Sequence, residues 1–232
     1  IFNCIKCQDQ KDGTTISVNT YPKIARKGKK KMKIGIPYFF LKNGIDAEIL
    51  DNFEKSIKKF KDLGYEIIEV VLPNISFSLP VYYIIMPAEV SSNLARFDGV
   101  KYGLYKEGES SIDDYFKTRG VGFGKETRRR IILGTYILSA GYYDAYYNKA
   151  GEVRMLLRKD FKEAFEKVDL ILTPTTPSPA FKIGEKTADP LQMYLSDIFT
   201  VTANLVGIPA ISVPSGFVEK DGKNLPLGIQ IS

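Results

Sequence analysis

Residues 33–72 read KIGIPYFFLKNGIDAEILDNFEKSIKKFKDLGYEIIEVVL, and this stretch decides the fold class. It opens with an apolar run at 33–40, and Asp46 then stands where the N-cap of a helix is expected. Apolar residues follow at three- and four-residue spacing up to Gly64, which is the pattern of an amphipathic helix that ends at a glycine. The run at 65–72 is rich in Ile and Val and predicts a second strand. A strand, a helix and a strand in this order form a β-α-β unit with parallel strands, so we predict an α/β protein.

The rest of the chain continues with helices and then returns to strands. Helix patterns occupy four segments, at 81–97, 111–118, 125–139 and 142–168. A strand is expected at 169–172, because its apolar residues lead into a proline-punctuated loop. Later signals predict one more helix and two strands, at 189–205, 210–213 and 227–231. No repeat, low-complexity tract or linker divides the sequence, so we predict that residues 1–232 belong to one domain.

The composition excludes several kinds of catalytic site. The chain contains no histidine, so it cannot form a Ser-His-Asp triad, a Cys-His pair, or a zinc or haem site with histidine ligands. Its two cysteines cannot make a disulfide framework, which indicates a reducing compartment, either the cytoplasm or the interior of an organelle. Charges or prolines interrupt every apolar run well short of the roughly 20 residues that a membrane span requires. We therefore predict no membrane role.

Three local motifs have weak functional interpretations. The net charge of +6 comes largely from a basic cluster at 26–33, which is typical of a solvated loop, although it would also suit a polyanionic partner. Cys4 and Cys7 form a CxxC pair, but a structural zinc site needs four ligands; coincidence is the simplest interpretation, with a redox pair or an intermolecular metal site as alternatives. The glycines of 120–124 follow no strand, which favours a hinge or loop. We assign no metal site to this chain.

Two motifs on predicted helices have both a structural and a functional interpretation. Arg128, Arg129 and Arg130 fan over about 200° of a helix surface, so only one or two of them can point inward. An inward arginine beside apolar residues needs an anion, which is either an internal carboxylate or the carboxylate of a ligand. Tyrosines within 142–147 form two i,i+4 pairs, which indicates core or interface packing more than a stacking platform.

Three blocks of sequence resemble the amidase signature family and, within it, the A subunits of the glutamine-dependent aspartyl/glutamyl-tRNA amidotransferases. The first block reads YYIIMPAEVSSNLARFDGVKYG at 82–103. The second contains GFGKE at 122–126, RRI at 129–131, LGT at 133–135 and SAGYYDAYY at 139–147. The third contains LTPTTP at 172–177, DPL at 189–191, MY at 193–194, Asp197, NL at 204–205 and PAISVP at 209–214. The resemblance extends over nearly the whole chain.

The resemblance implies one amidase signature domain, with a mixed β-sheet wrapped by helices, of which residues 1–232 are the C-terminal-side portion. Family members cleave amides with a serine nucleophile, a second serine in a cis peptide and a lysine. The glycine- and serine-rich segment that carries the two serines has no counterpart in this sequence, which contains not one Gly-Gly pair. We therefore expect no catalytic residue on this chain.

The resemblance also implies a binding site for glutamine. By position, Arg130 resembles the arginine that binds the α-carboxylate, Asp197 resembles the acid that receives the α-amino group, and Tyr82 resembles the pocket tyrosine. A zwitterion suits such a set, because its carboxylate needs a cation and its ammonium needs an anion. Arg129, one position away, is the alternative for the arginine.

For the complete enzyme, the resemblance implies that glutamine is hydrolysed to glutamate and that the ammonia amidates misacylated glutamyl-tRNA or aspartyl-tRNA. The implied partners are the missing N-terminal half of the same polypeptide, a B subunit that uses ATP and magnesium, and a C subunit. We expect no cofactor on this chain. Two alternatives remain open. One is a general amidase of the same family, whose neutral substrate would offer Asp197 no ammonium, and the other is a non-catalytic chain that binds RNA or protein through its basic cluster and tyrosines.

Overall fold

The computed structural model describes residues 7–17, 32–42, 44–186 and 190–232. The chain divides into two compact units, Ile1–Lys31 and Met32–Ser232. In the first unit, Cys7 of the predicted CxxC pair is exposed and is not part of a disulfide. Cys4 and the basic residues of 26–31 lie outside the described residues, so both motifs stay predictions.

The described part of the first unit is a turn that side chains stabilise. The hydroxyl of Thr15 donates to the backbone carbonyl oxygen of Asp9 at 2.9 Å, and the hydroxyl of Thr14 donates to the carboxylate of Asp12 at 2.7 Å. The hydrogen bonds from the Thr14 side chain and backbone lower the pKa of the exposed Asp12 carboxyl below its usual value, against a smaller opposing effect of burial. This turn is described by itself, and the elements below all belong to the second unit.

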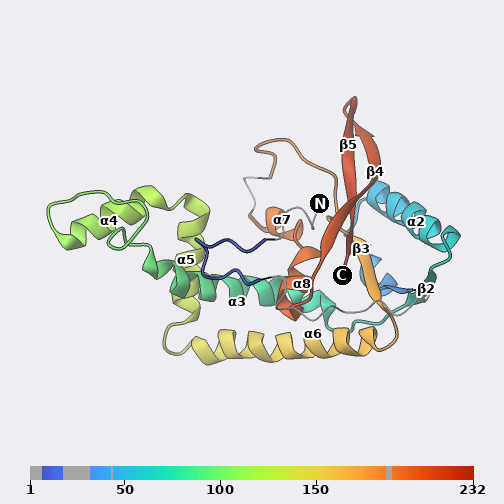
Figure 1. The fold of residues 1–232 in the computed structure, drawn as a ribbon, viewed down its shortest axis with the longest axis horizontal. Coiled ribbons are helices and arrows are strands. Elements are labelled where there is room, and N and C mark those ends of the chain that lie inside the picture. The colour runs from blue at the N-terminus through green and yellow to red at the C-terminus, as the bar shows by residue number, and fades with distance from the viewer. Residues whose placement is uncertain (1–6, 18–31, 43, 187–189) are drawn as a thin grey trace. The chain divides into compact units, whose positions relative to one another are not determined.

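Five strands form one mixed sheet in the order β2-β1-β3-β5-β4 (Figure 1). The strands are β1 Lys33–Ile36, β2 Glu66–Glu69, β3 Leu170–Pro174, β4 Ile211–Lys220 and β5 Lys223–Ile231. β1 lies between β2 and β3 and is parallel to both, whereas β5 is antiparallel to β3 and to β4. Helix α2, Ala47–Asp62, connects β1 to β2. The predicted β-α-β unit and the α/β fold class are therefore confirmed.

The hairpin of β4 and β5 is longer than the predicted strands at 210–213 and 227–231. Its turn contains Asp221 and Gly222, whose φ angles are positive at 52° and 70°. Two positive φ angles suit the tight hairpin turn that matches the twist of the strands, and Asp-Gly is a frequent sequence for it. Most residues near this turn are exposed and polar, so they carry no apolar alternation that would have shown the full strand lengths.

The other helices of the described chain are α3 Ser78–Asn93, α4 Ser111–Gly122, α5 Lys125–Ile137, α6 Lys149–Phe165, α7 Pro190–Leu195 and α8 Thr200–Val206. Short turns of 3-10 helix are η2 Tyr38–Leu41, η3 Ile75–Phe77 and η4 Leu94–Arg96, and η5 Tyr143–Asn148 is π-helical. The predicted helix at 142–168 therefore begins with a π-helical turn, and the predicted helix at 189–205 is divided into α7 and α8.

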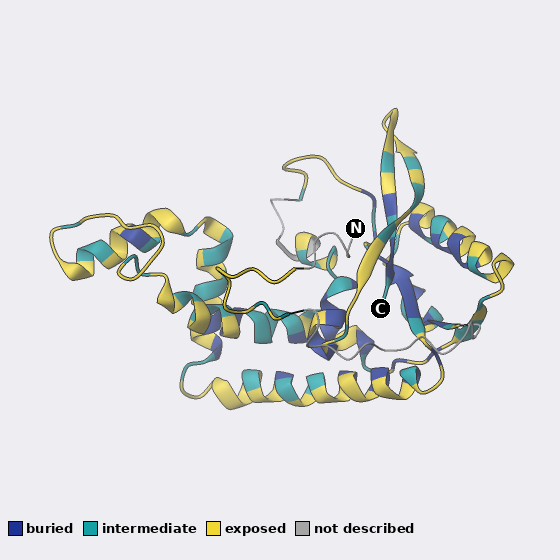
Figure 2. Ribbon diagram, in the orientation of Figure 1, coloured by how far each residue is buried: buried dark blue, intermediate teal, exposed yellow. Residues whose placement is uncertain are grey.

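The core consists of two clusters on opposite faces of the sheet. Successive residues of a strand point to opposite faces, and Ile171 and Leu172 of β3 accordingly belong to different clusters. The Leu172 cluster contains Phe53 of α2, and the Ile171 cluster contains Leu157 of α6 together with residues of α3 and α8. Figure 2 shows this burial in the strands and in α8, whereas the helix α4 and its flanking loops are mostly exposed.

Close packing of α3 against α5 positions the residues discussed below. A Cβ atom at Gly134 of α5 would overlap the backbone carbonyl oxygen of Pro87 in α3 and would crowd the side chain of Ser91. Only glycine allows the two helix backbones to approach so closely at this point. Gly134 and Pro87 are both buried.

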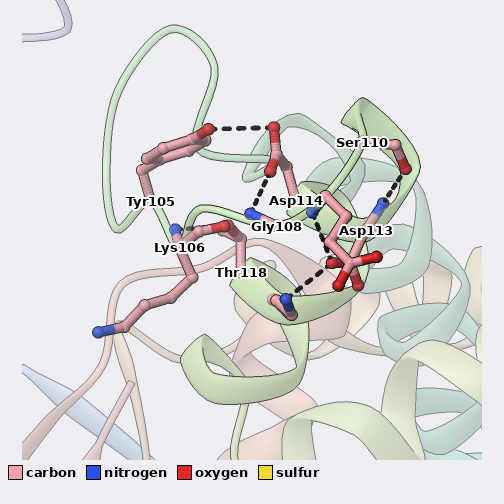
Figure 3. A network of polar contacts seen from close by, with 9 residues as sticks. Tyr105, Lys106, Gly108, Ser110, Asp113, Asp114 and Thr118 are labelled. Carbon is pink, nitrogen blue, oxygen red and sulfur yellow. Dashed lines mark hydrogen bonds and ion pairs between the residues drawn. The ribbon is translucent and has the colours of Figure 1, made fainter.

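The α4 segment, residues 97–123, is held together by polar contacts (Figure 3). Ser110 caps the helix, because its hydroxyl accepts the backbone N–H of Asp113, and the carboxylate of Asp113 accepts the backbone N–H of Glu109 in return. The hydroxyl of Tyr105 donates to Asp114 at 3.0 Å, and the hydroxyl of Thr118 accepts the backbone N–H of Lys106 at 2.9 Å; these contacts tie the preceding loop to α4.

Two sequence-based interpretations agree with the structure only in part. The glycines of 120–124 do not form one loop, because Gly120 and Gly122 lie within α4. Only 123–124 connects α4 to α5, with Gly124 as the N-cap of α5, and a hinge at this point stays a prediction. The tyrosines of 142–147 do stack in two i,i+4 pairs, with ring centroids 5.9 and 5.3 Å apart. Three of these four tyrosines are about 40% exposed, so the core interpretation is wrong for this chain. Packing at an interface stays a prediction.

Candidate functional site

The candidate site lies where three helical elements meet. Tyr83 comes from α3, Glu126 and Arg130 come from the first two turns of α5, and Tyr194 and Asp197 come from the end of α7 and the turn after it. Four of these side chains are on helices and Asp197 is in the turn after α7, and the close packing of α3 against α5 brings the first two elements together. None of the five residues is fully exposed.

The acidic end of the site is a hydrogen bond between Tyr83 and Asp197. The Tyr83 hydroxyl donates to Asp197 Oδ2 at 3.0 Å. Burial, followed by this hydrogen bond and the negative charge of Asp197, raises the pKa of Tyr83 well above its ordinary value, while the charge of Arg130 opposes the rise. Tyr83 is therefore neutral at physiological pH and remains a hydrogen-bond donor.

The basic end of the site is Arg130, which contacts three different groups. Its Nε–H donates to Glu126 Oε1 at 2.9 Å, Nη1 lies 3.6 Å from the sulfur of Met86, and its guanidinium carbon lies 5.8 Å from the centre of the Tyr83 ring. Among the described residues, no hydrogen bond from its Nη2 group is found. Burial alone would lower the pKa of Arg130, but the hydrogen bond and charge of Glu126 outweigh it and raise the pKa.

An aromatic pair joins the two ends. The rings of Tyr83 and Tyr194 are stacked with centroids 4.0 Å apart and planes inclined by 26°. The Tyr194 hydroxyl donates to Glu126 Oε1 at 2.9 Å, which is the oxygen that also receives the Nε–H of Arg130. The result is a continuous path of contacts from Arg130 through Glu126, Tyr194 and Tyr83 to Asp197.

The pKa of Glu126 reflects this arrangement. Burial alone would raise it, but hydrogen bonds from Arg130 and Tyr194 and the charges of Arg130 and Arg129 lower it below the ordinary value. Glu126 is therefore ionised at physiological pH. Because Arg129 and Arg130 both contact the single carboxylate of Glu126, these three side chains together keep a net positive charge.

The structure brings Arg130 and Asp197 to opposite ends of one cluster, and it places Tyr82 beside that cluster. The Tyr82 ring packs against the Ile171 core cluster and meets the Tyr83 ring edge-on, with centroids 5.3 Å apart. Tyr83, the next residue, makes the direct bond to Asp197. Arg129 is more exposed than Arg130, with 54% against 28% of the side chain accessible. This difference favours Arg130 over Arg129 as the inward arginine.

Three residues of the cluster were not among the sequence-based predictions. Tyr83, Glu126 and Tyr194 all stand inside motifs that carry the resemblance, at 82–103, 122–126 and 193–194. Their place in these motifs was the sequence signal that could have identified them as site residues. The internal salt bridge that was one interpretation of the arginines is present between Arg130 and Glu126.

The described part of the chain offers no metal centre and no membrane span. No group of three or more Cys, Asp or Glu side chains within it is placed to hold a metal ion. None of its helices combines the length and the apolar character that crossing a membrane demands.

Comparison with known proteins identifies the family. The model of the amidase family matches residues 1–232, so the chain belongs to the amidase family. It is 56% identical over 229 residues to the A subunit of the glutamyl-tRNA(Gln) amidotransferase of Pelagibacter ubique, a match that covers 98% of this chain and 47% of that protein. The corresponding protein of Thermodesulfovibrio yellowstonii is 52% identical over 233 residues and is covered to 48%. The chain thus spans about half the length of the curated relatives it matches.

Solved structures agree with this result. The crystal structure of the A subunit of the glutamyl-tRNA(Gln) amidotransferase from Thermotoga maritima matches with a TM-score of 0.64 and 40% sequence identity, covering 97% of this chain and 43% of that one. An amidase crystal structure matches with a TM-score of 0.63 at 22% identity and so shares the fold alone. The five-stranded mixed sheet with its helices is therefore part of the amidase signature fold.

Proposed function

We propose that this chain is the glutamine-binding, C-terminal-side half of the glutaminase subunit of a tRNA-dependent amidotransferase. The similarity to A subunits of glutamyl-tRNA(Gln) amidotransferases supports the assignment to that subunit. The lack of a glycine- and serine-rich segment in the sequence supports the C-terminal-side half. The proposed compartment is the cytoplasm or the interior of an organelle.

The observation that carries the proposal is the separation of a cation and an anion across one aromatic pair. Arg130 lies at one end of the cluster and Asp197 at the other, with Tyr83 in contact with both. Free glutamine presents the matching pair of charges, so its α-carboxylate would bind Arg130 and its α-ammonium would bind Asp197. Tyr82 would line the same pocket through its contact with Tyr83. Holding both charged groups fixes the direction in which the side-chain amide points.

In this proposal the chain binds and orients glutamine, and the other half of the glutaminase polypeptide supplies the chemistry. That half would carry the serine nucleophile, the second serine and the lysine, so this chain alone would be inactive. Glutamine would be hydrolysed to glutamate and ammonia. The ammonia would pass to a B subunit that uses ATP and magnesium to amidate glutamyl-tRNA or aspartyl-tRNA, and a C subunit would complete the assembly.

The test is glutaminase kinetics on the complete enzyme, in which the full-length glutaminase subunit is combined with its B and C partners. Arg130→Ala removes a charged hydrogen-bond donor to the substrate carboxylate, so we expect the KM for glutamine to rise about 10- to 100-fold. The control is Arg128→Ala on the same helix, because Arg128 is exposed and outside the contact path. Equal KM values for the two variants would reject the pocket.

A second variant distinguishes a glutamine-specific enzyme from a general amidase. Asp197→Asn removes the anion but keeps the shape of the side chain, so glutamine should bind more weakly while small amides without an ammonium group should be unaffected. An enzyme that hydrolyses neutral amides as well as glutamine, with no change in Asp197→Asn, would instead be a general amidase. Salt-sensitive binding of RNA by the chain without its partners, together with no glutaminase activity in the complete assembly, would favour the non-catalytic alternative.

A further inference from the structure

Glu126 occupies a special position in the contact path, because its two oxygens accept hydrogen bonds from three side chains. Oε1 accepts the Nε–H of Arg130 and the hydroxyl of Tyr194, both at 2.9 Å. Oε2 accepts an N–H from Nη1 of Arg129 at 2.8 Å. Glu126 lies in the first turn of α5, where the helix dipole also favours a negative charge.

The bond to Nε controls how Arg130 is presented. A guanidinium group is planar, so a bond at Nε fixes the orientation of the whole fork and therefore the direction of its two Nη groups. Arg130 lies four residues after Glu126 on the same helix, a spacing at which side chains meet. Without this bond the arginine side chain would be free to take several rotamers, and a ligand would have to order it on binding.

The bond to Tyr194 extends the same control toward the acidic end. Tyr194 stacks on Tyr83, and Tyr83 donates its hydroxyl proton to Asp197. The hydrogen bond from the Tyr194 hydroxyl to the Glu126 carboxylate therefore fixes the position of the Tyr194 ring, on which the Tyr83 ring is stacked. One oxygen atom, Oε1 of Glu126, is thus shared by the arginine and by the aromatic pair that reaches the aspartate.

We propose that Glu126 is a positioning residue, which orients the cationic end of the site, Arg130, and through Tyr194 and Tyr83 supports the anionic end, Asp197, for a zwitterionic amino acid. This inference rests on the function proposed above. Glu126 does not touch the substrate; it acts through Arg130 on one side and through Tyr194 on the other. Because Arg129 shares the carboxylate, the basic end keeps the net positive charge that an incoming carboxylate needs.

The test is a double-mutant cycle in the complete enzyme with its partner subunits, with the KM and kcat for glutamine as readouts. We expect Glu126→Ala to raise KM about 5- to 50-fold, in the range of a lost charged hydrogen bond, with a smaller change in kcat. The double variant with Arg130→Ala should have a KM below the product of the two single effects, because the part of the Glu126 effect that acts through Arg130 is already lost. The rise that remains above Arg130→Ala alone should be no larger than that of Tyr194→Phe, because it acts through the Tyr194 hydroxyl. Effects of the two changes that simply multiply would show a separate structural role and would overturn the proposal.

Tyr194→Phe tests the link to the acidic end. This variant keeps the ring and its stack on Tyr83 but removes the hydroxyl that Glu126 holds. We expect a several-fold rise in the KM for glutamine, and a smaller rise for an analogue that lacks the α-amino group, because only the free amino acid uses Asp197. An unchanged KM for glutamine in Tyr194→Phe, with Glu126→Ala impaired, would restrict Glu126 to Arg130 and reject the coupling of the two ends.

The outcomes separate this inference from the function on which it rests. If Arg130→Ala leaves the KM for glutamine unchanged, the proposed function fails. If Arg130→Ala raises KM while Glu126→Ala does not, the glutamine site stands and only the role of Glu126 is wrong. Thermal unfolding of each variant checks that the assembled protein remains folded.

Discussion

The sheet and the α4 segment are stabilised in different ways, although both belong to the same compact unit. Ile34, Leu157 and Leu172, which pack around the sheet, are at most 1% exposed. In contrast, Thr118 is the one buried residue of helix α4, and Ile112 and Phe116 on that helix are 69% and 68% exposed. Hydrophobic burial therefore holds the sheet, whereas hydrogen bonds to the backbone hold the α4 segment.

This difference indicates which region contributes most to the free energy of unfolding. Burial of a large apolar side chain contributes about 1.5–3 kcal/mol, whereas a hydrogen bond adds a net of about 0.5–1.5 kcal/mol. The sheet should therefore set the global stability, and the α4 segment should open locally at lower cost. Four substitutions or conditions, from the largest expected effect to the smallest, test this contrast.

Leu157→Ala should have the largest effect. The side chain is fully buried in the Ile171 cluster, and its removal leaves a cavity, so we expect a loss of about 2–5 kcal/mol in the free energy of unfolding. The measurement is urea denaturation of the 232-residue chain. Leu156→Ala is the control, since Leu156 is the preceding residue on α6 and is 47% exposed. Similar losses in the two variants would contradict a core centred on Leu157.

Gly134→Ala should destabilise the chain by about 1–3 kcal/mol, because the added methyl group would force α5 away from Pro87. The matched control is Gly151→Ala on α6, where an added Cβ meets nothing within 4 Å. There the change should stabilise the helix by about 0.5–1 kcal/mol through its better helix propensity. Effects of the same sign at both glycines would refute the close approach of α3 and α5.

Ser110→Ala should cost about 1 kcal/mol, and the loss should be confined to the α4 segment. The change removes the side chain that caps the backbone N–H of Asp113. Hydrogen exchange of the amides of α4 should become faster, while the urea midpoint that reports on the sheet should stay the same. A parallel fall in the urea midpoint would show that the two regions unfold together.

A fall in pH should produce the smallest effect, again in the α4 segment. The hydrogen bond from Lys117, then that from the backbone of Glu109, lowers the pKa of Asp113 below its usual value of 3.8. Stability from a lowered pKa is present above the unfolded value and is lost as pH falls through the folded value, so the loss should occur below pH 3.8.

Hydrogen exchange of α4 at about pH 5 and about pH 3 checks this expectation, since the two conditions lie on either side of the usual carboxyl pKa. The unmodified chain should show faster exchange at the lower pH after correction for the intrinsic rates. Asp113→Asn carries no ionisable group at this position, so the difference between the two pH values should shrink. An equal difference in both proteins would assign the pH effect to another carboxylate.

Elements that depend on local pattern could be predicted from the sequence. Helix α2 was expected from its apolar spacing, and its observed bounds, Ala47–Asp62, begin directly after the expected N-cap at Asp46. The predicted strands of the β4–β5 hairpin were too short, because most of its outer residues are exposed and polar and give little apolar alternation. The period of apolar residues reports burial, so an exposed strand lacks that signal.

In the candidate site too, some residues could be predicted from the sequence and others could not. Arg130 and Asp197 were predicted from motifs, and the structure places both in one cluster. The resemblance named Tyr82, whereas Tyr83 makes the hydrogen bond to Asp197. Neighbours on a helix point about 100° apart, so only the packing of that helix decides which of them faces Asp197. Glu126 and Tyr194 are 68 residues apart, and the hydrogen bond between them exists only in the folded chain.

The sequence by itself determined the α/β class, the parallel β-α-β unit, the exclusion of histidine chemistry and the likeness to the amidase family, since each depends on composition, on short spacing or on motifs read in order. The tertiary structure alone decided which tyrosine bonds Asp197 and which carboxylate holds Arg130. The physical reason is that a side chain's direction around its helix depends on where that helix packs. Here the backbone contact between Gly134 and Pro87 sets how α5 meets α3, and no local pattern contains that contact.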